Sequence, residues 1–377
     1  NTSPPGGFYA IVHPVVRDPQ AIWFADKVRR AGFSDAAAFA SHFDLKPYRL
    51  KQIYRAAAKE LVADIAEVTT LPKELRSALS DAGFSFESVT PVVVQRSGDK
   101  QTSKGLFRLA DGAEVEAVLM EHFGDRNTVC ISSQAGCAFA CAFCSTGQAG
   151  FTRQLEATEI FDQARYFARE LAAKGKRITN IVFMGMGEPF HNYDAVMNAV
   201  ALLHDGQGFG LGHRHITIST VGLVDRIDQF ADEGIQVNLA ISLHAPSDEV
   251  RSGIMPVNRK FSMDELLAAC DRYIDKTNRK VFFEYVMLRG VNDSVEHAAE
   301  LARRMKGHLY HLNLIPYNTT PDGPFAGTEN DDIWKFAGVL DEAGIPTTVR
   351  ANMGRDISAA CGQLRAQTQP KAHKISA

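Results

Sequence analysis

The sequence contains no uninterrupted apolar run of the roughly 18 residues that a membrane-spanning helix requires. Its mean hydropathy is −0.15, and no basic segment followed by an apolar one opens the chain, so we expect neither a membrane span nor a secretory leader. The 29 Gly and 15 Pro residues are scattered, which excludes a collagen-like or low-complexity chain. The 377 residues, 45% of them hydrophobic, allow one large barrel-type domain plus a smaller one, and we expect a cytoplasmic protein.

The chain also has little net charge. A value of −3 argues weakly against a nucleic-acid partner, but the charge is unevenly distributed. Residues 1–100 hold 13 Lys and Arg against 11 Asp and Glu, whereas the rest holds 28 against 33. Residues 46–59 contain five basic residues and no acid, and Lys51, Arg55 and Lys59 form one stripe on a helix. This stripe is either a solvated helix face or a contact for phosphates.

Cysteine is scarce, and four of the six cysteines fall within fifteen residues. They are Cys130, Cys137, Cys141, Cys144, Cys270 and Cys361. A disulfide-stapled secreted protein is usually small and spreads its cysteines along the chain. A tight cluster in a chain of this length therefore favours metal or redox chemistry.

The first third of the chain is predicted to be helical and then to form short strands. Apolar residues at three-to-four spacing predict helices at 21–31, 48–62 and 75–82, with Pro72 placed at the start of the last one. Short strands are expected at 91–95, 105–109 and 113–119, and Asp111-Gly112 forms the turn between the last two.

Strand-like and helical runs then alternate along the chain. The expected strands are 128–132, 178–184, 215–219, 237–243, 281–287 and 310–315. The helices between and after them include 157–173, 193–203, 263–273, 295–305 and 332–342, and 347–350 adds a last short strand. Six such units predict an α/β fold with a parallel sheet that is curled or barrel-like. Functional residues are then expected at the carboxyl ends of the strands.

After the first of these strands comes a C-x3-C-x2-C triplet formed by Cys137, Cys141 and Cys144. Three closely spaced thiolates are a ligand set for a soft metal or an iron–sulfur cluster. A closed structural zinc site uses four ligands, usually in two separated pairs. The alternatives are therefore a zinc knuckle completed by Cys130, and apolar cysteines that share a loop by coincidence.

The triplet, with an aromatic residue before its last Cys, resembles the cluster motif of the radical S-adenosylmethionine superfamily. Further segments resemble the RNA methyltransferase family that contains RlmN and Cfr. They are 134–137 (QAGC), 144–148 (CSTGQ), 151–153 (FTR), 184–189 (MGMGEP), 241–246 (ISLHAP), 313–318 (NLIPYN) and 359–364 (AACGQL). The resemblance implies a partial (β/α)6 barrel, with a [4Fe–4S] cluster whose fourth iron site is open to S-adenosylmethionine. It also implies a helical RNA-contacting domain over 1–90, a β-hairpin extension over 91–122, the barrel over 123–350 and a C-terminal segment over 351–377.

The resemblance also implies a cofactor site. Cys137, Cys141 and Cys144 would hold the cluster. The residues expected to contact S-adenosylmethionine lie at strand ends and are Gly187, Glu188, Ser219, Ser242, Leu243, His244 and Asn318. On physical grounds Gly187 lets a ligand approach the backbone, and Glu188 can accept hydrogen bonds from an ammonium group. Taken alone, the glycines predict only a tight strand-to-helix turn.

Two distant cysteines match the family's catalytic pair. By this resemblance Cys361 accepts a methyl group from one S-adenosylmethionine, and a radical made from a second one activates that S-methyl group. The methyl carbon then bonds to adenine, and Cys130 releases the base by forming a disulfide with Cys361. Glu116 is expected to remove the proton, with Glu114 as its nearest competitor. Cys270 is expected to be a small buried residue.

The leading hypothesis is an RlmN-type enzyme that methylates C2 of adenosine in 23S rRNA and in tRNA. The alternative within the family is Cfr-type C8 methylation, which confers antibiotic resistance; Pro189 and Pro316 favour the RlmN type. Two further alternatives lie outside this family: a zinc-binding RNA protein without catalysis, and a radical enzyme acting on a small molecule or peptide. The family also implies a monomer that is reduced by a donor such as flavodoxin.

Overall fold

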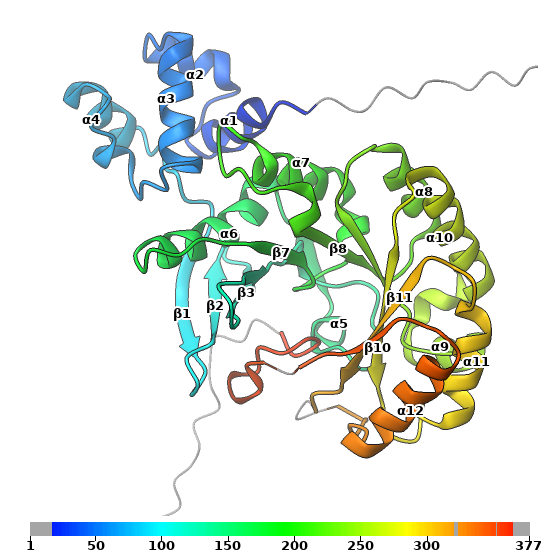
Figure 1. The fold of residues 1–377 in the computed structure, drawn as a ribbon. Coiled ribbons are helices and arrows are strands. Elements are labelled where there is room, and N and C mark those ends of the chain that lie inside the picture. Colours follow the sequence, from blue (N-terminus) through cyan, green and yellow to red (C-terminus); the bar gives the residue numbers. More distant parts are fainter. Residues whose placement is uncertain (1–16, 320–322, 352, 365–377) are drawn as a thin grey trace, which may run out of the picture.

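The computed structural model describes residues 17–319, 323–351 and 353–364 (Figure 1). No helix among these residues is long and apolar enough to cross a membrane. Residues 1–16, on which the expectation of no secretory leader rests, and residues 365–377 of the expected C-terminal segment lie outside the described ranges.

Within residues 17–89, four α-helices precede the first strand. They are α1 (Pro19–Arg30), α2 (Ala36–His42), α3 (Pro47–Ala58) and α4 (Lys73–Asp81). Asp18 and Asp35 cap the first two by accepting the backbone N–H groups of Ala21 and Ala38. The three predicted helices are present, within a few residues of their expected ends. Helix α2 was missed because its seven residues contain a single large buried side chain, Phe39, and so carry no apolar period.

A ten-stranded sheet forms the body of the protein, in the order β1-β2-β3-β4-β7-β8-β9-β10-β11-β12. Its first strands are β1 (Thr90–Arg96), β2 (Thr102–Arg108), β3 (Glu114–Glu121) and β4 (Asn127–Cys130), which pair in antiparallel fashion. The parallel strands that follow are β7 (Asn180–Phe183), β8 (Ile216–Thr220), β9 (Asn238–Ser242), β10 (Val281–Met287), β11 (Tyr310–Pro316) and β12 (Thr347–Val349). The predicted α/β fold with six β–α units is confirmed, and the expected short last strand is present.

The predicted hairpin extension is continuous with the barrel sheet. Strand β3 pairs with β4 in a register that places Val118 opposite Cys130. A smaller two-stranded sheet of β5 (Gln134–Gly136) and β6 (Phe151–Gln154) flanks the cysteine triplet. Neither of these two strands was predicted, because they are held by contacts with each other and have no apolar period.

Helices cover the outer face of the curved sheet (Figure 1). They include α6 (Ala157–Ala172), α7 (Tyr193–His204), α8 (Val224–Asp232), α10 (Met263–Thr277), α11 (Val295–Met305) and α12 (Asn330–Glu342). Short helices α5 (Ser145–Ala149) and α9 (Asp248–Ile254) follow the cysteine triplet and β9. Helix α8 was not predicted, although Val224, Ile227 and Phe230 recur at helical spacing.

A buried ion pair joins the N-terminal helices to the barrel. The Lys27 ammonium of α1 lies 2.6 Å from a carboxylate oxygen of Asp162 on α6, and both side chains are at most 1% exposed. The same ammonium donates to the carbonyl of Phe86 and the hydroxyl of Ser88. Burial lowers the pKa of Lys27, whereas the charge of Asp162 raises it. This arrangement satisfies all three donors of the ammonium without water.

Replacing Asp162 with Ala should lower the free energy of unfolding by about 3–5 kcal/mol, because it leaves the Lys27 charge buried without its partner. The double variant Lys27→Met/Asp162→Ala should lose less than Asp162→Ala alone, since no unpaired charge remains. Urea unfolding measures both. The exposed pair of Arg272 and Asp228 is the control, and Arg272→Met should cost at most about 1 kcal/mol. A double variant less stable than Asp162→Ala would contradict this account.

Candidate active site

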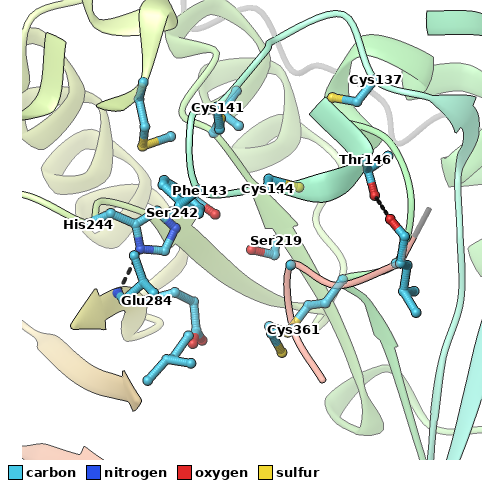
Figure 2. Close-up of a pocket in the computed structure, with 18 of the residues that line it drawn as sticks. Cys137, Cys141, Phe143, Cys144, Thr146, Ser219, Ser242, His244, Glu284 and Cys361 are labelled. Carbon is cyan, nitrogen blue, oxygen red and sulfur yellow. Dashed lines mark hydrogen bonds between the residues drawn. The ribbon is translucent and has the colours of Figure 1, made fainter. Parts of the chain in front are cut away.

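A cavity of about 150 Å³ opens at the carboxyl ends of the parallel strands (Figure 2). It is lined by residues far apart in the sequence, including Cys137, Cys141, Cys144, Gly187, Glu188, Ser219, Ser242, His244, Glu284, Asn318, Arg350 and Cys361. Figure 2 shows the three clustered cysteines on one side and Cys361 with Glu284 on the other. This is the edge of a parallel sheet where ligands bind.

The cysteine triplet lies in a loop closed at its base by β5 and β6. Cys137 N–H donates to the carbonyl of Gly150, and Cys144 N–H donates to that of Cys141. Gly136 has φ +76°, and a Cβ there would lie 1.9 Å from the Gly150 carbonyl oxygen, so only glycine fits this crossing. The loop is therefore held in one shape by backbone contacts.

The donor set suits an iron–sulfur cluster better than a single ion. Among the described residues, no group of three His, Cys, Asp or Glu side chains converges tightly enough to hold one metal ion. Three thiols nevertheless line the same cavity, and a multinuclear cluster separates its ligand sulfurs more widely than one ion does. Burial raises the pKa of Cys137 to about 12 and that of Cys141 well above its usual value, and a bound metal cation would favour their thiolate forms.

The residues after β7 form the floor of the cavity. Gly187 has φ +99°, and a Cβ there would lie 2.5 Å from the Gln134 side chain. The Glu188 carboxylate is buried and accepts the backbone N–H groups of Phe190 and Val221, at 2.9 and 2.7 Å. Burial raises the pKa of Glu188 to about 7. Its remaining lone pairs suit a cationic ligand group.

Of the other predicted cofactor residues, four line the cavity and one does not. Ser219, Ser242, His244 and Asn318 line the cavity. Leu243 is outside its lining, with a fully buried side chain, and its carbonyl accepts a hydrogen bond from Arg251. Of this predicted set, Leu243 therefore does not line the cavity.

His244 is held in one orientation. It has φ +59°, and its Nδ1 accepts the backbone N–H of Val286 at 3.0 Å. Burial and the charge of Arg251 lower its pKa to about 3, so the ring is neutral. Because Nδ1 is an acceptor, the ring proton is on Nε2, where it can donate to a ligand. Phe143 packs edge-on against the ring, at 4.7 Å between centroids.

The two distant cysteines meet at a second, adjoining cavity of about 450 Å³. Cys130 and Cys361 both line it as free thiols, and Cys361 also lines the first cavity. Cys361 is exposed to the cavities that it lines, and the protein around it raises the pKa of its thiol. Burial and the nearby Cys361 raise the pKa of Cys130 to about 12. The triplet does not share Cys130, so this structure disfavours the four-cysteine zinc knuckle.

Contacts at both ends hold the segment that carries Cys361 across the open side of the sheet (Figure 1). Ser145 N–H donates to the Gly362 carbonyl, and the Thr146 hydroxyl donates to that of Leu364 at 2.6 Å. At the other end, Asp356 accepts the backbone N–H of Gly98 in the β1–β2 turn. The segment thus joins the triplet loop to the antiparallel hairpin.

The two candidate proton acceptors on β3 have different surroundings. Glu116 is buried, 3.1 Å from the ammonium of Lys104, which also donates to the Ser358 carbonyl. It lies two residues from Val118, the pairing partner of Cys130, and so on the same face of the sheet as Cys130. Glu114 instead pairs with the half-exposed Arg108. This placement favours Glu116, although it lines neither cavity.

Two charged residues of the site were missed in the sequence. Arg350 lines both cavities, forms a 3.0 Å ion pair with Glu284, and lowers the pKa of both Cys130 and Cys361. Glu284 also accepts a hydrogen bond from Asn313. Each had a signal: Arg350 ends the last predicted strand, and Glu284 is the one charge in the apolar run 281–287.

The two remaining expectations concern residues away from the cavities. Cys270 is fully buried in α10, where burial raises its thiol pKa. Lys51, Arg55 and Lys59 are exposed along α3, opposite its buried face. Arg55 pairs with Glu60, and Lys59 donates to the Gly206 carbonyl. The stripe is therefore accessible to a partner, and part of its charge is locally engaged.

Residues 131–302 match the model of the Radical SAM superfamily. A "Probable dual-specificity RNA methyltransferase RlmN" of Chloroflexus aurantiacus is 48% identical over 328 residues, which is 84% of this chain and 86% of that protein. The protein of the same name from Staphylococcus aureus is 46% identical over 321 residues, or 85% and 87% of the two chains. A crystal structure of a radical SAM methyltransferase from Sphaerobacter thermophilus matches with a TM-score of 0.85 and 48% identity, over 88% of this chain and 97% of that one.

Replacing Glu188 with Gln should change how stability depends on pH. The Glu188 pKa of about 7 lies above the roughly 4.3 of a solvated Glu, so between these values the folded protein binds a proton that the unfolded chain releases. The buried carboxyl therefore makes the free energy of unfolding fall as pH rises through this window, by about 4 kcal/mol in all. Urea unfolding of cluster-free protein should show this fall in the wild type relative to Glu188→Gln. The exposed Glu342→Gln control should follow the wild type. Parallel curves for Glu188→Gln and wild type would refute the burial effect.

Proposed function

The chain belongs to the RlmN family of radical S-adenosylmethionine RNA methyltransferases, and on that basis we propose that it methylates C2 of adenosine in 23S rRNA and in tRNA. The observation that carries the proposal is the position of Cys361. It borders the cavity of the cysteine triplet and also the cavity that contains Cys130. A group carried on the Cys361 sulfur can therefore be activated on one side and released on the other.

We assign the cluster to Cys137, Cys141 and Cys144, with one iron left free of protein ligands. The cofactor S-adenosylmethionine is assigned to the cavity beside them, lined by Gly187, Glu188, Ser219, Ser242, His244 and Asn318. The buried Glu188 carboxylate would accept the cofactor's ammonium, and Nε2–H of His244 would donate to an acceptor group. Two cofactor molecules are used in each turnover, one for the methyl group and one for the radical.

When bound, cluster and cofactor supply an electrophilic methyl group and a 5′-deoxyadenosyl radical. In our scheme the Cys361 thiolate would accept the methyl group, and the S-methyl carbon would lose a hydrogen atom to the radical and then bond to C2 of adenine. One electron would pass from this adduct to the oxidised cluster, and Glu116 would take the proton from C2. The Cys130 thiolate would then attack the Cys361 sulfur; a disulfide forms, the carbon–sulfur bond breaks with its electron pair on carbon, and this carbon takes up a proton to become the methyl group of the released base. Arg350 is placed to favour both thiolates, since its charge opposes the effect of burial on their pKa.

The RNA would contact the accessible stripe of Lys51, Arg55 and Lys59 on α3, where three cations can meet backbone phosphates. We propose that the enzyme works as a cytoplasmic monomer and that a flavodoxin-like donor reduces its cluster. The identity of 46–48% with proteins named RlmN, together with Pro189 and Pro316, supports C2 over C8 as the target.

Nucleoside analysis tests the target atom. We expect mass spectrometry of 23S rRNA and tRNA, from a host that lacks its own enzyme and expresses this chain, to show 2-methyladenosine. Cells with the empty vector are the control. Methylation at C8 alone would overturn the C2 assignment, and unmodified tRNA beside modified rRNA would remove tRNA as a substrate.

Replacing Cys361 and replacing Cys130 should stop the reaction at different stages. Cys361→Ala should abolish RNA methylation while reductive cofactor cleavage continues, because the methyl acceptor is lost. Cys130→Ala should accumulate a covalent protein–RNA adduct, since no thiol is present to release the base. Gel mobility of RNase-treated protein measures the adduct. Cys270→Ala is the matched control and should behave like the wild type, because Cys270 is buried away from the site. Free methylated product from Cys130→Ala would refute its assigned role.

A further inference from the structure

Arg251, on the short helix α9, is a charged side chain that the proposed mechanism does not use. It is fully buried. Its guanidinium donates to the carbonyls of Val221, Ser242 and Leu243, at 2.7, 3.1 and 3.1 Å, and to the side-chain oxygen of Asn258 at 2.9 Å. Within the described residues these acceptors are all neutral, so the buried charge is well hydrogen-bonded but has no directly bonded carboxylate.

These acceptors lie at the carboxyl ends of two neighbouring strands. Strand β8 contains Ser219 and ends at Thr220, directly before Val221. Ser242 is the last residue of β9. The backbone of Val221 is held at both its N–H and its carbonyl, because the Glu188 carboxylate accepts its N–H at 2.7 Å. The planar guanidinium thus ties together the strand ends whose side chains line the proposed cofactor cavity. A lysine ammonium cannot reproduce this fork.

The same charge lies next to the cysteine triplet. Ala142 N–H donates to the carbonyl of Ile254 at 2.9 Å, which joins the triplet loop to α9. Cys141 packs in a small buried cluster with Ile254 and Met255. The charge of Arg251 lowers the pKa of Cys141, against the larger effect of burial. Burial lowers the pKa of Arg251 itself to about 10, so it is charged at neutral pH.

The side-chain amide of Asn258 lies between the Arg251 guanidinium and the carboxylate of Asp248. Asp248 accepts hydrogen bonds from Asn258 and from the backbone N–H of Met263, both at 2.8 Å, and Asn258 separates it from the guanidinium. The Arg251 charge is therefore only partly compensated. A cluster held by three thiolates is anionic and gains more negative charge on reduction, so a buried cation beside it favours the reduced form.

We propose that Arg251 is a positioning residue with two separable effects: its fork fixes the ends of β8 and β9 for the cofactor, and its charge raises the reduction potential of the cluster. This inference rests on the proposed assignment of the cluster to the triplet. Its two effects depend on different properties of the side chain, so substitutions can separate them.

The test uses Arg251→Lys, which keeps the charge, and Arg251→Gln, which loses it, in reconstituted enzyme without RNA. An anaerobic redox titration followed by electron paramagnetic resonance gives the midpoint potential. We expect Arg251→Gln to lower the reduced-to-oxidised ratio at a fixed potential at least tenfold, a shift of about 59 mV for one electron. Arg251→Lys should keep the wild-type potential. Both should raise the dissociation constant for S-adenosylmethionine about tenfold, because both lose the fork. The exposed Arg259→Gln should change neither quantity.

A wild-type potential in Arg251→Gln, or an equal fall in both variants, would overturn the electrostatic effect. If both variants lose the cluster while Arg259→Gln retains it, Arg251 serves folding alone and the inference fails. A wild-type protein that binds no iron would overturn the proposed function along with it. A wild-type cluster that is insensitive to Arg251 would overturn this inference only.

Discussion

The backbone of Val221 is held between two buried side chains, the Glu188 carboxyl group at its N–H and the Arg251 guanidinium at its carbonyl. In a low-dielectric interior, hydrogen bonds from a charged guanidinium are strong. The contacts bring the turn after β7, the end of β8 and helix α9 to one point. Part of the cavity lining depends on that point, since Ser219 and Ser242 lie on the strands that Arg251 ties together and His244 follows the second of them.

The site also depends on contacts outside the parallel strands, which set the position of Cys361. Cys361 comes after the last strand, and its position is set by contacts to α5 on one side and to the β1–β2 hairpin on the other. The antiparallel strands at the edge of the sheet therefore contribute to the chemistry, although they are not part of the barrel repeat. Lys104 illustrates this, since one ammonium contacts both Glu116 and the Ser358 carbonyl. A shift of the hairpin would move Glu116 and Cys361, the proposed proton acceptor and methyl acceptor, together.

Regular periodicity made most of the fold predictable. The run 281–287 is apolar except for Glu284 and was predicted with the bounds it has as β10, because a strand buried on both faces is a continuous apolar segment. The short elements around the triplet were not predicted, since β5, β6 and α5 depend on contacts with each other rather than on a period. The choice between Glu114 and Glu116 was likewise open in the sequence: both lie on one strand face, and only the neighbours, Arg108 for one and Lys104 for the other, distinguish them.

By itself the sequence determined the α/β class, the three clustered thiols and the family, because these depend on local spacing and on motifs that recur in order. The tertiary structure decided which residues lie together at the same cavity. It separated Cys130 from the triplet and placed Cys361 between two cavities, and it put Leu243 in the core while His244 faces the proposed cofactor cavity. It also brought Arg350 and Arg251 to the site, where each contacts groups far away in the chain. Such roles come from long-range packing and from the burial of charge, which no local pattern of residues encodes.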